Sequence, residues 1–249
     1  MPGKARPPLI DMALSRQAPH VDYPFDLPCV RHLGVLAFHP AVTYLVGENG
    51  SGKSTLIEAL AQCCGLNVEG GNRNTVFNTH QTASLLWKHL ELRTAVAGIR
   101  SGFFFRAETL YNLFTKAEEE KRDPHGWHVY GWSDRHQASH GEGHIRLFKE
   151  KVQGDVLIFD EPEAALSPHR QLAFLALIRQ WIQQGSQVII ATHSPIILSY
   201  PDAWIYGLDS GPLQRIAYEE CACVQVMEAF MQQRQRMVSA VLADPDEPT

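Results

Sequence analysis

Short apolar runs alternate along this chain with stretches of helical spacing. The runs that predict strands cover residues 42–46, 102–106, 156–159 and 187–191. The stretches that predict helices cover residues 54–64, 108–122, 171–183 and 224–242, and runs at 203–208 and 213–218 predict a closing hairpin. Continuous β-branched runs are typical of strands covered on both faces. The sequence therefore predicts an α/β fold with a mostly parallel central sheet.

One helix prediction rests on its apolar spacing alone. The segment 171–183 has helical spacing at Leu172, Leu175, Ala176 and Ile182. An amphipathic helix of this kind covers one face of a sheet.

The composition is that of a globular protein with one substantial core. Of the 249 residues, 45% are hydrophobic and 20% are charged, and we expect a single domain over residues 1–249. Prolines at positions 7, 8, 19, 24 and 28 predict an irregular lead-in over residues 1–29. Residues 108–145 are expected to form a small inserted helical subdomain.

Charge and hydropathy argue against several partners and locations. No apolar run approaches the roughly 18 residues that a membrane helix requires, and the first residues lack the apolar centre of a secretory signal. We therefore expect a cytoplasmic protein and do not expect membrane association. A formal net charge of −5 does not indicate nucleic-acid binding, although it leaves room for a local basic stripe. The five cysteines form no paired CxxC set, which favours free thiols.

The strongest chemical signal is GENGSGKST at residues 47–55. It fits G-x-x-x-x-G-K-[ST] and falls between a predicted strand and a predicted helix, as a phosphate loop requires. In such a loop Lys53 neutralises the β- and γ-phosphates, and Ser54 offers its hydroxyl to Mg²⁺. The residues assigned to nucleotide binding are Gly47, Glu48, Asn49, Gly50, Ser51, Gly52, Lys53, Ser54 and Thr55.

Two further predicted strands end in chemically useful residues. The run at 156–159 is followed by Asp160, a ligand for Mg²⁺, and by Glu161, a general base for water. His193 follows the run at 187–191 and is expected beside them at the same edge of the sheet, where it could contact the γ-phosphate. We therefore assign Lys53, Glu161 and His193 to catalysis.

The phosphate loop is followed by the SHGE stretch at 139–142, then by the strand ending in Asp-Glu and by the strand followed by His. This order of motifs resembles that of the ATP-binding-cassette ATPases. The resemblance implies ATP and Mg²⁺ as cofactors and an ATP-dependent head-to-tail homodimer. It also implies that Ser139, Gly141 and Glu142 form a signature motif that caps the nucleotide of a second subunit. His140 departs from the glycine usual in that motif.

The segments GFFFRAE, DEPEAALSPHRQ and ATHSPIIL narrow the resemblance. They are similar to small stand-alone bacterial AAA-family ATPases related to the heads of chromosome-maintenance and recombination-repair ATPases. The resemblance implies that Glu108 or Arg106 stands where cassette ATPases have a metal-sensing glutamine, and that Ser167 replaces an aspartate common in the class. An adenine-stacking aromatic residue is expected before the loop, and Tyr23, Phe25 and Phe38 stay open as candidates.

Three functions are compatible with these residues. The leading hypothesis is an ATPase that dimerises on ATP, separates on hydrolysis and acts as a switch on an unidentified protein partner. The first alternative is the energising subunit of a membrane transporter. The second is a slowly hydrolysing, nucleotide-gated module in a DNA-repair or defence assembly.

Overall fold

The computed structural model describes residues 7–67, 71–72, 84–107, 145, 148–150, 152–209 and 212–243. The signature residues Ser139, Gly141 and Glu142, together with Glu108, lie outside these ranges. The predicted helix at 108–122 and most of the proposed subdomain at 108–145 lie outside them as well. Predictions for these residues therefore stay predictions.

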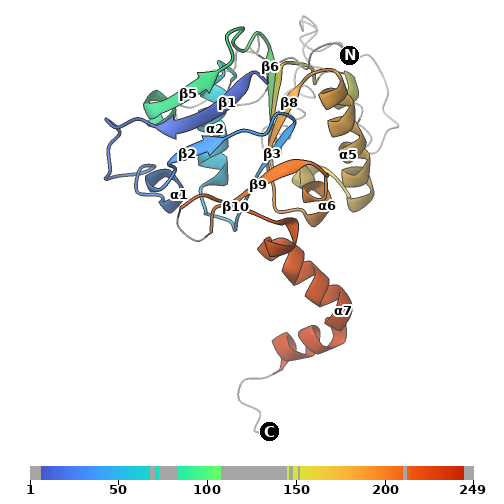
Figure 1. The fold of residues 1–249 in the computed structure, drawn as a ribbon. Coiled ribbons are helices and arrows are strands. Elements are labelled where there is room, and N and C mark those ends of the chain that lie inside the picture. Colours follow the sequence, from blue (N-terminus) through green and yellow to red (C-terminus); the bar gives the residue numbers. More distant parts are fainter. Residues whose placement is uncertain are drawn as a thin grey trace, which may run out of the picture.

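A seven-stranded sheet in the order β10-β9-β3-β8-β7-β6-β4 forms the centre of the molecule (Figure 1). Strands β9, β3, β8, β7 and β6 are parallel neighbours, and β10 and β4 pair antiparallel at the two edges. The strands are β3 (Val42–Val46), β4 (Gly71–Asn72), β6 (Gly102–Arg106), β7 (Val156–Asp160), β8 (Gln187–Ala191), β9 (Ala203–Gly207) and β10 (Gln214–Ile216). This arrangement confirms the predicted fold class.

A second, antiparallel sheet of three strands has the order β2-β1-β5, with β1 (Leu9–Leu14), β2 (Val35–Ala37) and β5 (Leu90–Thr94). The expectation of an irregular lead-in over residues 1–29 is therefore wrong for residues 9–14. The prolines flank β1 and do not interrupt it, and Leu9 and Met12 are buried in the core. The side chain of Gln187, on β8, also exchanges hydrogen bonds with the backbone N–H and C=O of Leu9.

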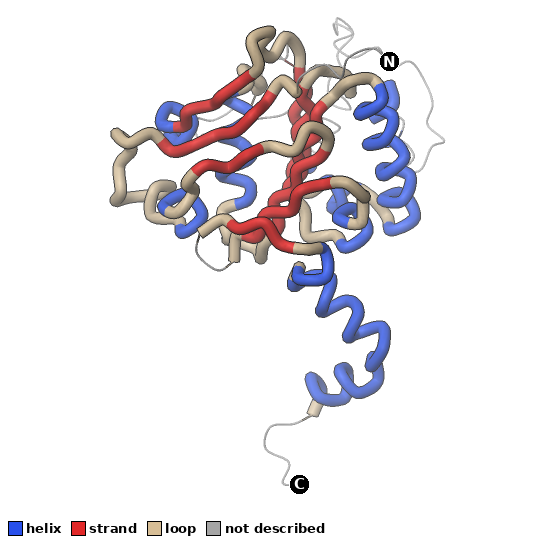
Figure 2. The backbone as a smooth tube through the Cα atoms, in the orientation of Figure 1, coloured by secondary structure: helices blue, strands red, loops and turns tan. Residues whose placement is uncertain are grey.

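The helices lie against these sheets, except for the last one, which extends away from them (Figure 2). The α-helices are α1 (Pro28–Arg31), α2 (Lys53–Cys63), α5 (Pro168–Gln183), α6 (Pro195–Leu198) and α7 (Ala222–Leu242). Short 3₁₀ turns are η1 (Leu85–His89), η2 (Pro162–Ala165) and η3 (Tyr218–Glu220). None of the helices in the described ranges is long and apolar enough to cross a membrane.

Alternate residues of the central strands face two different hydrophobic clusters. On β7, Ile158 packs in the cluster that joins α2 to the three-stranded sheet, whereas Leu157 and Phe159 pack in the cluster that contains α5. The Phe159 ring stacks on Trp181 of α5 with the ring centroids 5.3 Å apart. Because both faces of the sheet are covered, its central strands are largely apolar, as their sequences predict.

The helical spacing in α5 identifies the helix but not the face that is buried. The core side takes Phe174, Leu177, Ile178 and Trp181, while Leu172 is 55% exposed. The helix has more apolar residues than one face needs, and the larger aromatic side chains occupy the contact with the sheet. Apolar spacing identifies a helix, but it does not show which face is buried when the helix carries apolar residues on two sides.

Candidate functional site

The site lies where three neighbouring parallel strands end. Strand β8 pairs with both β3 and β7, and Asp160 at the end of β7 is in register with Ala191 at the end of β8. The loops that follow these three strands therefore converge at one edge of the sheet. Open α/β sheets bind ligands at this carboxyl edge.

The loop after β3 curls around the side chain of Lys53. Gly50 and Gly52 have φ angles of 83° and 94°, a left-handed conformation that favours glycine. Lys53 is only 4% exposed, and its Nζ donates hydrogen bonds to the carbonyl oxygens of Gly47 and Glu48 at 2.6 and 2.9 Å. The loop therefore holds a cation at its centre, at the start of α2. A helix start beside a cation favours an anionic ligand.

The Ser54 hydroxyl lies 3.2 Å from Oδ1 of Asp160 and donates a hydrogen bond to it. Asp160 is 3% exposed, and burial raises the pKa of its carboxyl to about 7. The guanidinium of Arg106 opposes that rise, with its Nε 4.0 Å from Oδ2 of Asp160. Arg106 also pairs with Glu58 at 2.5 Å, so its charge is shared between two carboxylates.

The pair formed by Ser54 and Asp160 has the chemistry of a magnesium site. A hydroxyl and a carboxylate are hard oxygen donors, the type that Mg²⁺ prefers. Arg106 shares its charge between Glu58 and Asp160, so the buried carboxylate of Asp160 is only partly neutralised. A divalent cation bound beside it would neutralise the rest. Ser54 and Asp160 therefore fit Mg²⁺. Arg106 lies close enough to Asp160 to influence an ion bound there.

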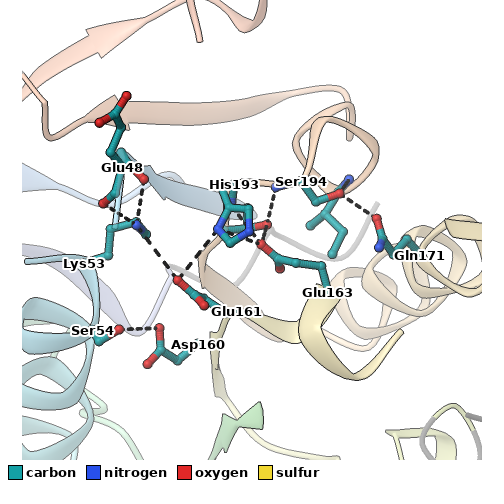
Figure 3. Close-up of polar contacts among 12 residues, drawn as sticks. Glu48, Lys53, Ser54, Asp160, Glu161, Glu163, Gln171, His193 and Ser194 are labelled. Carbon is teal, nitrogen blue, oxygen red and sulfur yellow. Dashed lines mark hydrogen bonds and ion pairs between the residues drawn. The ribbon is translucent and has the colours of Figure 1, made fainter. Parts of the chain in front are cut away.

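The chain leaves strand β7 at Glu161, directly after Asp160. The backbone of Glu161 is left-handed, with φ 48° and ψ 54°, and its N–H donates to the carbonyl of Ala191 at 2.9 Å. This turn leaves the carboxylate partly exposed, with Oε1 3.9 Å from Nζ of Lys53 and 3.7 Å from Nδ1 of His193 (Figure 3). His193 thus lies beside Glu161 at one edge of the sheet, as expected, with Lys53 close to both, and their catalytic roles stay predictions.

Glu163 is a component of the site that sequence reasoning missed. Its Oε1 accepts hydrogen bonds from the Thr192 hydroxyl at 2.7 Å and from the His193 N–H at 2.8 Å. Its other oxygen is buried and has no hydrogen-bond partner among the described residues. One carboxylate thus fixes the backbone at the point where the chain leaves β8. The sequence signal for it is the third acidic residue of DEPE, although that residue alone does not reveal its hydrogen-bond partners.

The structure separates the candidates for the adenine-stacking residue. Phe25 and Phe38 are buried in the core, whereas Tyr23 is 66% exposed. The Tyr23 hydroxyl lies 3.1 Å from Oγ1 of Thr55, in the first turn of α2. Tyr23 is therefore the one of the three whose ring is accessible beside the phosphate loop. Ser167 is exposed at the start of α5.

Two protein families match parts of this sequence. A family described as "AAA domain" matches residues 29–122, and one described as "AAA domain, putative AbiEii toxin, Type IV TA system" matches residues 138–199. The first match includes the phosphate loop. The second includes the strand ends that carry Asp160 and His193.

The chain is also similar to ATP-binding proteins of the cassette type. The cobalt import ATP-binding protein CbiO of Salmonella paratyphi A is 30% identical over 234 residues, which covers 82% of this chain and 81% of that protein. A macrolide export ATP-binding/permease protein MacB of Yersinia pestis is 26% identical over 61% of this chain and 26% of its own length.

Among solved structures, cbiO1 from Clostridium perfringens is 16% identical, with a TM-score of 0.43 over 94% of this chain and 100% of the other. The SMC head domain from Thermotoga maritima is 15% identical, with a TM-score of 0.39 over 74% of this chain and 93% of the other.

The 30% identity to the CbiO protein over 82% of this chain shows the family. This chain belongs to the ATP-binding-cassette family of P-loop ATPases, proteins that bind and hydrolyse ATP.

Proposed function

We propose that this protein hydrolyses ATP with Glu161 as general base, and that ATP joins two copies head to tail in a switch acting on an unidentified protein partner. The proposal rests on one observation at the carboxyl edge of the sheet. Oε1 of Glu161 lies 3.9 Å from Nζ of Lys53 and 3.7 Å from Nδ1 of His193. A lysine, a partly exposed carboxylate and an imidazole can neutralise phosphate charge, accept a proton from water and contact the γ-phosphate.

Each residue has a separate task in this proposal. Lys53 neutralises charge on the β- and γ-phosphates, and residues 47–55 hold the phosphates through backbone N–H groups. Glu161 accepts a proton from the attacking water, and His193 contacts the γ-phosphate. Ser54 and Asp160 would hold Mg²⁺, which supplies positive charge to the phosphate oxygens when it is bound. Tyr23 stacks on the adenine.

The head-to-tail pairing rests on the signature residues, which lie outside the described ranges. Ser139, Gly141 and Glu142 of one copy would cap the γ-phosphate bound by the other. A helix start with a hydroxyl and an unhindered amide is a good receptor for an anion. Hydrolysis removes the phosphate that joins the two surfaces, so the pair separates.

A second function is favoured by one comparison. The similar CbiO protein is a cobalt import ATP-binding protein, which supports the alternative of an energising subunit for a membrane transporter. A transporter subunit should purify from membranes with a membrane protein and should hydrolyse ATP faster in its presence. A switch should hydrolyse ATP from the purified chain alone.

Phosphate release by the purified chain tests the proposal. We expect slow magnesium-dependent turnover, and a loss of about 10²-fold or more in Glu161→Gln because the base is removed. Binding of ATP should be retained, because the phosphate loop is unchanged. Turnover of Glu161→Gln at the wild-type rate would overturn the assignment of Glu161.

A further inference from the structure

Gln171 is a buried polar residue on the face of α5 that packs against the core. The residue is only 8% exposed, although glutamine is mostly found at protein surfaces. Both ends of its amide are hydrogen-bonded. Nε2 donates to the carbonyl of Leu166 at 3.0 Å, and Oε1 accepts from the Ser194 hydroxyl at 2.6 Å (Figure 3). A backbone carbonyl can only accept, so these partners also fix which way the amide faces. Gln171 therefore bridges two segments that are distant in the sequence.

Ser194 joins this bridge to the loop that follows β8. Its hydroxyl donates to Gln171 and accepts from the N–H of Ile197 at 3.2 Å, which caps the start of α6. The N–H of Ser194 donates to the hydroxyl oxygen of Thr192 at 3.0 Å. Thr192 and Ser194 are 0% and 6% exposed. Both neighbours of His193 are therefore held inside the protein.

The other end of the bridge lies in the segment that follows β7. The N–H of Leu166 donates to the carbonyl of Glu163 at 3.0 Å, and the carboxylate of Glu163 accepts the Thr192 hydroxyl. These hydrogen bonds close a ring that runs through Gln171, Ser194, Thr192, Glu163 and Leu166. The ring ties the segment after β7 to the loop after β8 at two points, Glu163 and Gln171.

The ring holds the chain on both sides of His193. The His193 side chain is 48% exposed, so its place depends on the backbone that carries it more than on packing. Its Nδ1 lies 3.7 Å from Oε1 of Glu161, which precedes Glu163 on the other segment. The imidazole and the carboxylate thus come from two segments that the ring connects. A restraint between the segments is also a restraint on the spacing of these two side chains.

We propose that Gln171 is a positioning residue for ATP hydrolysis, which sets the spacing between His193 and Glu161 by holding Ser194 against Leu166. This inference rests on the catalytic roles proposed above for His193 and Glu161. In it, Gln171 acts through Ser194 and does not contact the nucleotide. Its removal therefore changes the rate of the chemical step and leaves the binding of ATP in place.

Gln171→Met tests the bridge, because methionine has a similar length and makes neither hydrogen bond. We expect kcat to fall by about tenfold and the Kd for ATP to change by less than about twofold, from single-turnover hydrolysis and ATP titration. The matched control is Gln180→Met, at an exposed position of the same helix, which should leave both values unchanged. Circular dichroism of each variant checks that the fold is retained.

A double-mutant cycle with His193→Ala separates positioning from a general loss of stability. If Gln171 acts through His193, Gln171→Met should lower kcat by less than about twofold in a His193→Ala chain, where the imidazole is already absent. The free energy of unfolding should fall equally in both backgrounds, because the Ser194 hydroxyl and the Leu166 carbonyl lose their partner in each.

The cycle also distinguishes this inference from the proposed function. A slow His193→Ala chain together with a wild-type kcat in Gln171→Met would overturn the role of Gln171 alone. A loss of kcat from Gln171→Met that is equal in both backgrounds would do the same, because it would not pass through His193. A wild-type kcat in His193→Ala would overturn the proposed role of His193 and, with it, this inference.

Discussion

The carboxylate of Glu163 accepts a hydrogen bond from the backbone N–H of His193 at 2.8 Å. The same oxygen accepts the hydroxyl of Thr192, so one side chain after β7 fixes the chain that follows β8. This contact sets the position from which the imidazole of His193 faces Glu161. Glu163 is therefore a positioning residue for the proposed catalytic group.

Glu163→Ala should lower kcat by about tenfold while the Kd for ATP changes little, because the phosphate loop is untouched. It leaves two donors without an acceptor and should also reduce the free energy of unfolding by about 1–3 kcal/mol. Glu163→Gln retains one acceptor oxygen and should recover part of both losses. Single-turnover hydrolysis and ATP titration separate the two effects. An equal loss of ATP affinity and kcat would contradict the positioning role.

The buried Asp160 makes stability depend on pH. Its folded pKa is about 7, above the ordinary value of 3.8, because burial disfavours the charged form. The bound proton of Asp160 contributes to the free energy of unfolding. This contribution is complete below the unfolded pKa and is lost as the pH rises through about 7. Without nucleotide or metal, Asp160→Asn should therefore be more stable than wild type above that pH, by up to about 4 kcal/mol.

Chemical unfolding across about pH 5 to pH 8 tests this dependence. The difference between wild type and Asp160→Asn should grow with pH, and Mg²⁺ should reduce it, because the cation binds only the carboxylate. A variant that is less stable than wild type at the alkaline end would contradict the electrostatic account of this carboxyl. It would indicate that the hydrogen bond from Ser54 outweighs the cost of burial.

Tyr23 provides a test of adenine binding. Stacking of a base on an aromatic ring contributes about 1–3 kcal/mol, so Tyr23→Ala should raise the Kd for ATP by about tenfold. Tyr23→Phe keeps the ring and should stay close to wild type. Val21→Ala, at another exposed apolar position nearby, is the control. Fluorescence titration with ATP checks all three, and an unchanged Kd in Tyr23→Ala would exclude this ring from the nucleotide site.

The sequence predicts the central sheet well because its strands are short, continuous and covered on both faces. The strands at 102–106 and 187–191 match β6 and β8 residue for residue. The order of strand ends and motifs also places Lys53, Asp160, Glu161 and His193 at one edge. Local pattern and chain order are sufficient here, since parallel strands carry their loops to a common side.

Other features depend on contacts between distant parts of the chain. Strand β1 pairs with β5 across about 80 residues, and its position between prolines hides it from local pattern. The choice of Tyr23 over Phe25 and Phe38 requires knowledge of burial. Glu163 differs from its neighbours only through its hydrogen bonds to residues after β8, which no spacing rule within DEPE predicts.

The central claim is that ATP joins two copies and that Glu161 ends this pairing through hydrolysis. Its most direct test is the molecular mass of the Glu161→Gln chain in solution. Lys53→Ala is the control for lost phosphate binding. With saturating ATP and Mg²⁺, the account predicts a dimer for the Glu161→Gln chain, a monomer with ADP, and a monomer for the control. A Glu161→Gln chain that binds ATP yet stays monomeric would contradict it.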